Sequence, residues 1–255
     1  MNFTEYQILL FFLILIRFTS MMVIAPVFGI WGIPIIMKIG VSGIMALLVF
    51  GFVSPITPDL TLTVWNAAIL VAGEFLTGLT IGMIIKFLFS AIQIAGEYIS
   101  LDMGLTMAQQ FDPMFNQQIS IVSRMKNILA MLVFIIIDGH HYLIEAVVYS
   151  FRLLPIGTFQ MTALGIDKIM HISASVFVIG VKMAAPAIVS LFLTSVAMGI
   201  TARAVPQMNI FFVGFPVRIA VGFIALIMGL PMFVYLFKNL LTVFEKDTLY
   251  ILQVM

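Results

Sequence analysis

Long apolar segments separated by short polar breaks constrain the fold of this chain more than any other feature. A helix needs about 20 apolar residues to span a bilayer, and several segments reach or exceed that length. Together they predict an all-α, polytopic, membrane-associated chain of about five to six long or broken hydrophobic helices, arranged in helical hairpins. The segments run from Tyr6 to Val27, from Ile33 to Val53, from Leu62 towards Ala95, from Ile169 to Ala202 and from Ile210 to Leu241.

Composition supports a chain that works inside or beside a bilayer. Hydrophobic residues make up 63% of the 255 residues and charged residues 9%, whereas soluble domains carry about 25% charged residues. Lysine plus arginine number 12 against 11 acidic residues, so the charge balance gives no indication of nucleic-acid binding. The chain contains no cysteine, which excludes disulfides, cysteine-ligated metals and thiol nucleophiles.

Shorter apolar segments lie between the third and fourth long ones. Residues 128–137 fall short of a span, and the run Asp-Gly-His-His at 138–141 separates them from residues 142–154. These lengths predict two short helices or one broken helix. Within the third long segment, Gly78 and Gly82 lie four residues apart. That spacing fits a close helix contact and equally fits chance, because glycine is common in membrane helices.

Residues 102–126 are the most polar stretch among the apolar segments. Asp112 precedes Pro113, and a residue before proline is biased away from helical backbone, which predicts a helix end or turn. Methionine and phenylalanine are interspersed with glutamine and asparagine, a composition that does not fit a disordered segment. Long loops without secondary structure are uncommon in compact chains and are usually functional. We therefore interpret residues 102–126 as a functional central loop.

Charged side chains that lie within or next to the apolar segments need partners. A charge at the bilayer centre costs about 2.5–3.5 kcal/mol on insertion scales. One interpretation is a proton or ion relay, as in secondary transporters; the other is structural pairing at helix or subunit contacts. We favour structural pairing, because relays use carboxylates or histidines and most of these residues are lysine or arginine. The predicted buried-charge contacts are Arg17, Glu74, Lys86, Lys182, Arg203 and Arg218.

No arrangement typical of a catalytic or cofactor site is found in the sequence. His141 and Glu145 are four residues apart, a spacing that can place two metal ligands on one helix face. Structural zinc sites need four ligands, so a loop or interface contact is the preferred interpretation of this pair. The sequence has no His-Glu-x-x-His, Gly-x-Ser-x-Gly or phosphate-binding glycine-rich motif. We therefore expect no enzyme activity, no cofactor and no metal.

Several blocks of the sequence closely resemble the FliR family of flagellar biosynthesis proteins, in the same order along the chain. The most specific block is residues 203–222, RAVPQMNIFFVGFPVRIAVG. The others are residues 96–113, residues 138–141 with the Ser-Phe pair at 150–151 and Pro155, and Arg17 with residues 26–29. The related injectisome family, SctT, shares this pattern more loosely.

The resemblance implies a subunit of the flagellar type III protein export gate in the bacterial inner membrane, within the flagellar basal body. It implies a hetero-oligomeric assembly, with FliP-like and FliQ-like subunits as partners and FlhB-like and FlhA-like export components nearby. Unfolded exported proteins would be the substrate, and membrane lipid rather than nucleic acid would be the surroundings. Residues 1–160 would form a FliP-like helical unit, and residues 161–255 a FliQ-like helical hairpin with a C-terminal tail.

The resemblance also implies a role for the central loop, because the corresponding loop acts as a plug in the closed channel of such complexes. Its methionine and phenylalanine side chains can pack in an apolar constriction, while its amide side chains can stay hydrated. The implied plug residues are Met107, Gln109, Gln110, Phe111, Asp112, Pro113, Met114, Phe115, Asn116, Gln117 and Gln118.

An ion-coupled secondary transporter of small solutes is the alternative function. Its support is a pair of Gly-Glu-aromatic runs that begin at Gly73 and Gly96, without an inverted-repeat pattern. Purification distinguishes the two functions. A transporter should be stable alone or as a small homo-oligomer, whereas an export-gate subunit should co-purify with FliP and FliQ.

Overall fold

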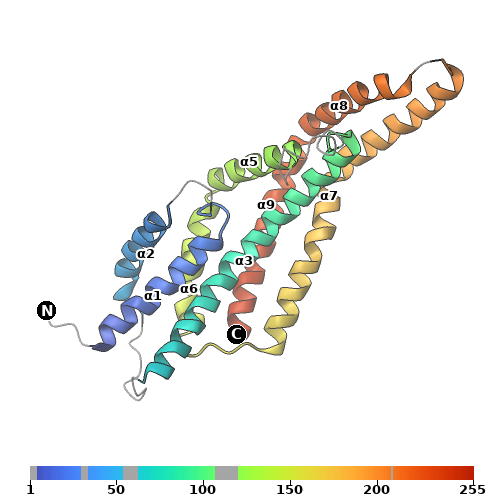
Figure 1. Cartoon of the computed structure of the whole chain (residues 1–255). Coiled ribbons are helices and arrows are strands. Elements are labelled where there is room, and N and C mark those ends of the chain that lie inside the picture. The colour runs from blue at the N-terminus through green and yellow to red at the C-terminus, as the bar shows by residue number, and fades with distance from the viewer. Residues whose placement is uncertain (1–4, 30–33, 54–62, 107–119, 208) are drawn as a thin grey trace. The chain divides into compact units, whose positions relative to one another are not determined.

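The computed structural model describes residues 5–29, 34–53, 63–106, 120–207 and 209–255. Within this part of the chain it contains eight helices and no strand, which confirms the predicted all-α class (Figure 1). The helices are α1 (Glu5–Ile24), α2 (Ile35–Phe50), α3 (Val64–Met103), α5 (Ile121–Ile136), α6 (Gly139–Leu153), α7 (Ala163–Ala204), α8 (Ile210–Met228) and α9 (Leu230–Val254).

Two breaks explain why these helices outnumber the predicted segments. The short segments on either side of residues 138–141 are separate helices, α5 and α6, which meet at Asp138 in a left-handed conformation with a φ of 58°. The last long segment is divided at Gly229, where α8 and α9 meet at a bend of 54°. The first break was predicted and the second was not.

Proline and asparagine set several of the helix ends. Pro34 precedes the first residue of α2, a place where the missing proline N–H costs no helical hydrogen bond. Asn209 caps α8, because its side chain accepts a hydrogen bond from the Phe212 N–H. α6 ends at Leu153, and its C-cap residue Leu154 directly precedes Pro155, which disfavours helical backbone in the residue before it.

Three of the described helices are long and apolar enough to cross a membrane: residues 6–24 of α1, α3 and α7. The bent pair of α8 and α9 passes the same test together and raises the number to four. α3 has 40 residues and α7 has 42, about twice the length that one span requires. The chain is therefore a polytopic membrane protein with helices that exceed a simple span.

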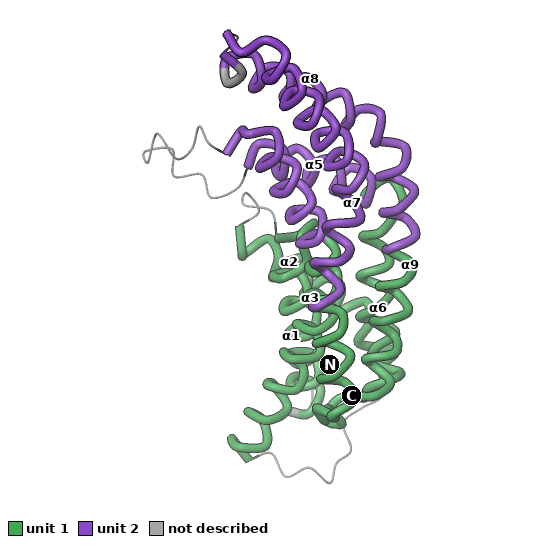
Figure 2. Tube along the Cα trace, turned by 90° about the vertical axis from the view of Figure 1, so that its right-hand side faces the viewer, with its two compact units in different colours: residues 1–88, 135–173, 241–255 green, residues 89–134, 174–240 purple. Residues whose placement is uncertain are grey.

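The described helices form two compact units (Figure 2). Unit 1 consists of residues 1–88, 135–173 and 241–255, and unit 2 consists of residues 89–134 and 174–240. Helices α3, α7 and α9 each contribute residues to both units. The predicted division near residue 160 concerns likeness to FliP and FliQ rather than compactness, and it stays a prediction.

In unit 1, the glycine pair of α3 lies against α1. A Cβ atom at Gly78 would overlap the Ser20 hydroxyl and the Arg17 carbonyl oxygen, and one at Gly82 would lie 2.9 Å from the Met21 carbonyl oxygen. Small residues at this spacing let two helix backbones approach closely. The spacing of these glycines therefore marks a real contact face rather than a chance repeat.

The end of α9 also belongs to unit 1, where it packs beside the start of α7. Lys168 Nζ lies 2.7 Å from the Asp247 carboxylate. Immediately before α7, the Gln160 N–H donates a 2.9 Å hydrogen bond to the Met255 carbonyl. These contacts attach residues 241–255 to residues 160–168, which also belong to unit 1.

In unit 2, the second half of α3 is surrounded by other helices. The Phe89 ring makes edge-to-face contacts with Phe134 of α5 and Phe237 of α9, with centroid separations of 5.8 Å and 6.0 Å. A Cβ atom at Gly180 of α7 would lie 3.1 Å from the Ala91 carbonyl oxygen. α3 therefore forms the core of this unit, with α5, α7 and α9 around it.

Candidate functional site

Arg17 and Glu74 form a buried ion pair in unit 1. The Arg17 Nε–H donates to Glu74 Oε2 at 2.5 Å, and both side chains are at most 1% exposed. The guanidinium also donates to the Ser150 hydroxyl at 2.9 Å and to the Leu154 carbonyl at 3.1 Å, and it lies 4.1 Å from the Phe151 ring centroid. The Arg17 guanidinium therefore connects α1 to α3 through Glu74. It also connects α1 to α6 through Ser150, and to the C-cap residue of α6, Leu154.

The other predicted buried-charge residues lie at the surface of the single chain. Lys86, Lys182 and Arg203 are exposed, and Arg218 is partly exposed. Lys86 also has an interaction within the chain. Contacts of these four residues with neighbouring subunits stay a prediction, because they concern partner chains.

In unit 2, α3 ends in a backbone cap at the entrance to the predicted central loop. The Gly104 N–H donates to the Leu101 carbonyl at 3.0 Å, and the Leu105 N–H donates to the Ser100 carbonyl at 3.1 Å. Gly104 has a φ of 79°, the left-handed conformation that this pair of hydrogen bonds requires and that glycine adopts without steric cost. The cap gives the end of α3 a defined position.

The start of α5 is capped as well and is attached to α3. The Ser120 hydroxyl accepts a hydrogen bond from the Ser123 N–H at 3.1 Å, as in a helix N-cap. The Ser120 N–H donates to Glu97 Oε1 at 3.0 Å, and the Ser123 hydroxyl donates to the Gln93 carbonyl at 2.9 Å. A Cβ atom at Gly96 would overlap the Ser123 backbone. We call these five residues the α3–α5 clamp.

The clamp changes the boundaries of the predicted central loop. The prediction of a loop over 102–126 is wrong at both ends, because residues 102–103 belong to α3 and residues 121–126 belong to α5. The capping side chains and Gly104 define these ends, whereas proline and the polar composition had suggested a longer loop. All the predicted plug residues lie outside the described residues: Met107, Gln109, Gln110, Phe111, Asp112, Pro113, Met114, Phe115, Asn116, Gln117 and Gln118.

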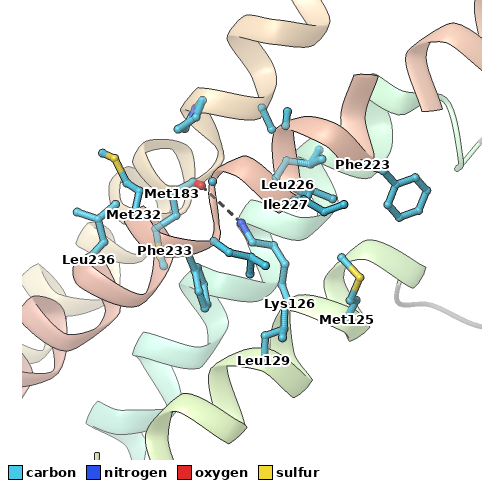
Figure 3. Close-up of a pocket in the computed structure, with 16 residues that line it drawn as sticks. Met125, Lys126, Leu129, Met183, Phe223, Leu226, Ile227, Met232, Phe233 and Leu236 are labelled. Atoms are coloured by element: carbon cyan, nitrogen blue, oxygen red, sulfur yellow. Dashed lines mark hydrogen bonds between the residues drawn. The ribbon is translucent and has the colours of Figure 1, made fainter. Parts of the chain in front are cut away.

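A second candidate site in unit 2 is an apolar pocket with a volume of about 350 Å³ (Figure 3). We call it the Lys126 pocket. Helices α3, α5, α7, α8 and α9 all contribute to its lining, which includes Gly229 at the bend between α8 and α9. Figure 3 shows the Lys126 side chain directed at Met183 of α7, with Phe233 of α9 beside it. The pocket is thus apolar, and Lys126 is the one cationic residue among the described residues that line it.

Lys126 is only 5% exposed. Its Nζ lies 3.5 Å from the Met183 carbonyl oxygen, which accepts a long hydrogen bond, and 5.4 Å from the Phe233 ring centroid. Burial lowers the pKa of Lys126 to about 8, because the ammonium loses hydration. Lys126 belongs to α5, which is not one of the candidate membrane spans.

Lys126 is buried in α5, although the polar composition of residues 102–126 predicts a loop there. A signal was nevertheless present. The buried residues Val122, Lys126, Ala130 and Phe134 of α5 follow one another at intervals of four, the spacing of a single helix face. Treating residues 121–136 as a helix would have put Lys126 on its apolar face.

The structure groups the histidines differently from the predicted pair. Within the described residues, Asp138, His140 and His141 have potential ligand atoms within 4.8 Å of one another, and Glu145 is not in this group. His141 Nδ1 lies 3.3 Å from the Asp138 carboxylate, and both side chains are largely exposed. Three ligands are one fewer than structural zinc sites use. A local contact at the break between α5 and α6 accounts for this geometry.

Comparison with known proteins identifies the family. Residues 8–243 match the family described as bacterial export proteins, family 1. The chain belongs to this family. It is 32% identical over 233 residues to the flagellar biosynthetic protein FliR of Bacillus subtilis (strain 168), a match that covers 90% of this chain and 89% of that protein.

Further relatives in this export family agree with the Bacillus match. Identity is 34% over 224 residues to the flagellar biosynthetic protein FliR of Pectobacterium carotovorum subsp. carotovorum, which covers 87% of this chain and 84% of that protein. It is 30% over 215 residues to the protein of the same name from Escherichia coli (strain K12), which covers 84% and 81%.

These matches confirm the resemblance to the FliR family of flagellar biosynthesis proteins. Combined with the apolar helices, they identify a membrane-embedded component of the flagellar export apparatus. The matched family is described as bacterial export proteins, and the relatives are named as flagellar biosynthetic proteins.

Proposed function

We propose that this chain forms, with FliP-like and FliQ-like subunits, the channel through which unfolded flagellar proteins cross the bacterial inner membrane in the flagellar basal body. The α3–α5 clamp carries this proposal. Together with the Gly104 cap, it fixes the helix ends on both sides of residues 107–119, and residues 107–118 resemble the plug loop of such complexes. FlhB-like and FlhA-like components complete the apparatus, and the energy for export comes from outside this chain.

The proposed plug is residues 107–118. A channel wide enough for an unfolded chain leaks ions at rest unless flexible side chains fill it. Methionine thioethers adapt to irregular apolar spaces, and amide side chains that leave a constriction can be hydrated again without leaving buried polar groups unpaired. The Gly104 cap at the end of α3 and the α3–α5 clamp at the start of α5 hold the two helix ends between which this segment lies in the sequence.

The proposed assembly is tested by purification. Expressed with FliP-like and FliQ-like subunits, an affinity-tagged chain should elute with both in one detergent-stable complex, whose stoichiometry follows from its intact mass. Expressed alone, the chain should aggregate or be degraded, because it exposes large apolar side chains over several helices. A monodisperse, protease-resistant monomer that binds neither subunit would contradict the proposal.

The plug is tested by shortening residues 107–118 to a brief Gly/Ser linker in the full complex. We expect the complex to assemble and its resting permeability to small solutes to rise, because the constriction loses the side chains that fill it. A Gly/Ser segment of the original length is the control that separates side-chain chemistry from loop length. Unchanged leak and normal export in the assembled short variant would show that the segment only connects α3 to α5 and is not a plug.

A further inference from the structure

We propose that the Lys126 pocket receives an apolar helix from another membrane subunit of the export apparatus, with an Asp or Glu side chain of that helix paired to Lys126. This inference rests on the proposed function, because it requires a membrane-embedded partner. It adds a specific docking site and the chemistry of its occupant. The charge of Lys126, the apolar lining of the pocket and its volume support this occupant.

The charge of Lys126 is incompletely compensated in this chain. An ammonium group offers three hydrogen-bond donors, and Lys126 uses one in a 3.5 Å contact with the Met183 carbonyl and faces the Phe233 ring. Among the described residues, no carboxylate lies within 4.0 Å of its Nζ. An unpaired buried charge is strongly unfavourable. A carboxylate placed in the pocket would supply the missing charge and a strong, short hydrogen bond.

The rest of the pocket selects an apolar occupant. Apart from Lys126, its lining side chains are apolar, and several continue onto the surface of α8 and α9. Ile227 is 65% exposed and Met232 is 54% exposed. An occupant that covers these side chains and also reaches Lys126 needs apolar residues around a single acidic one. An apolar helix with one carboxylate has this pattern.

Size and depth favour a protein side chain over a lipid. A volume of about 350 Å³ lies at the low end of the range for small-molecule pockets, about 300–1,000 Å³. It suits a few side chains from one helix face. A phospholipid would have to bring a bulky, hydrated phosphate to an ammonium that is only 5% exposed. Gly229, at the bend of 54° between α8 and α9, also lines the pocket.

The test uses the full chain in its complex with the co-expressed FliP-like and FliQ-like subunits. A photo-crosslinking amino acid is placed at Met232, which lines the pocket, or at Tyr235, which lies on the same helix, is 66% exposed and does not line it. We expect Met232 to give at least a tenfold higher yield of one subunit product, whose crosslinked peptide contains an Asp or Glu. A product confined to lipid or to this chain, or a peptide without an acidic residue, would overturn the inference.

Charge exchange then tests the pair itself. Lys126→Glu should lower recovery of the crosslinked subunit at least tenfold, and replacing the identified acidic residue by lysine should restore at least half of it. Absence of this rescue would overturn the pairing, whereas the crosslink in the unmodified Lys126 chain does not depend on the variant folding. Co-purification of the three subunits separates the two proposals. A complex that forms without the predicted crosslink removes this docking site and leaves the proposed function intact.

Discussion

Replacing Glu74 by leucine is expected to lower the stability of unit 1 by about 3–5 kcal/mol, the usual cost of removing one partner of a buried ion pair. Arg17 would remain almost completely buried with its charge opposed only by neutral acceptors on Ser150 and Leu154. We expect low cellular levels, faster proteolysis and poor recovery of the complex. Thermal unfolding in detergent and quantitative co-purification measure these effects.

Two controls define the origin of the Glu74 effect. Glu145→Leu changes an exposed glutamate of α6 and should alter stability by about 0.5 kcal/mol or less. The double variant Arg17→Met/Glu74→Leu removes both charges and should recover part of the lost stability, because an apolar pair can replace a buried ion pair. Intact assembly of Glu74→Leu with a selective loss of proton-coupled export would instead support the relay interpretation.

Replacing Gly96 by alanine is expected to have the second large effect. A Cβ atom there would overlap the Ser123 backbone, which cannot yield as a flexible side chain does, so α5 has to move away from α3. Overpacking of this kind costs about 1–3 kcal/mol. The displacement would also weaken the hydrogen bonds of Ser120 and Ser123 to α3. We expect a lower unfolding temperature and a raised resting permeability of the assembled complex.

Gly40→Ala is the matched control for Gly96→Ala. Gly40 is exposed in α2, and a Cβ atom there would meet nothing within 4 Å. Alanine is favoured over glycine in a helix interior by about 1 kcal/mol, so this variant should be as stable as the parent or slightly more stable. Equal unfolding temperatures and equal leak for the two alanine variants would contradict the prediction. They would show that moving α5 away from α3 at Gly96 neither destabilises the protein nor opens the channel.

The sequence predicted those features of the fold that depend on neighbouring residues. Apolar length predicted the long helices, and the polar run at 138–141 predicted the break between α5 and α6. The break at Gly229 was missed, because a lone glycine inside an apolar run is common in membrane helices and need not interrupt them. The loop boundaries were misplaced because the caps at Gly104 and Ser120 depend on local geometry that composition does not report.

Long-range contacts were the least predictable part of the candidate sites. Arg17 and Glu74 were each recognised as charges that need partners, yet no spacing rule connects residues 57 positions apart in the sequence. Lys126 was missed because its burial depends on α7 and α9, which pack on a helix that the polar composition had concealed. The family resemblance supplied the function, since the export role follows from an assembly rather than from any reactive group in one chain.

Unit 1 is built from segments at both ends of the chain, and this limits the order in which the protein can fold during synthesis. This unit contains residues 1–88, 135–173 and 241–255, and the contacts of Lys168 with Asp247 and of Gln160 with Met255 join the second of these segments to the third. Its first helices leave the ribosome long before the segment that completes them. Until then, their apolar surfaces need cover from lipid or from a neighbouring subunit. Assembly with partners can therefore begin on a nascent chain, before its own fold is closed.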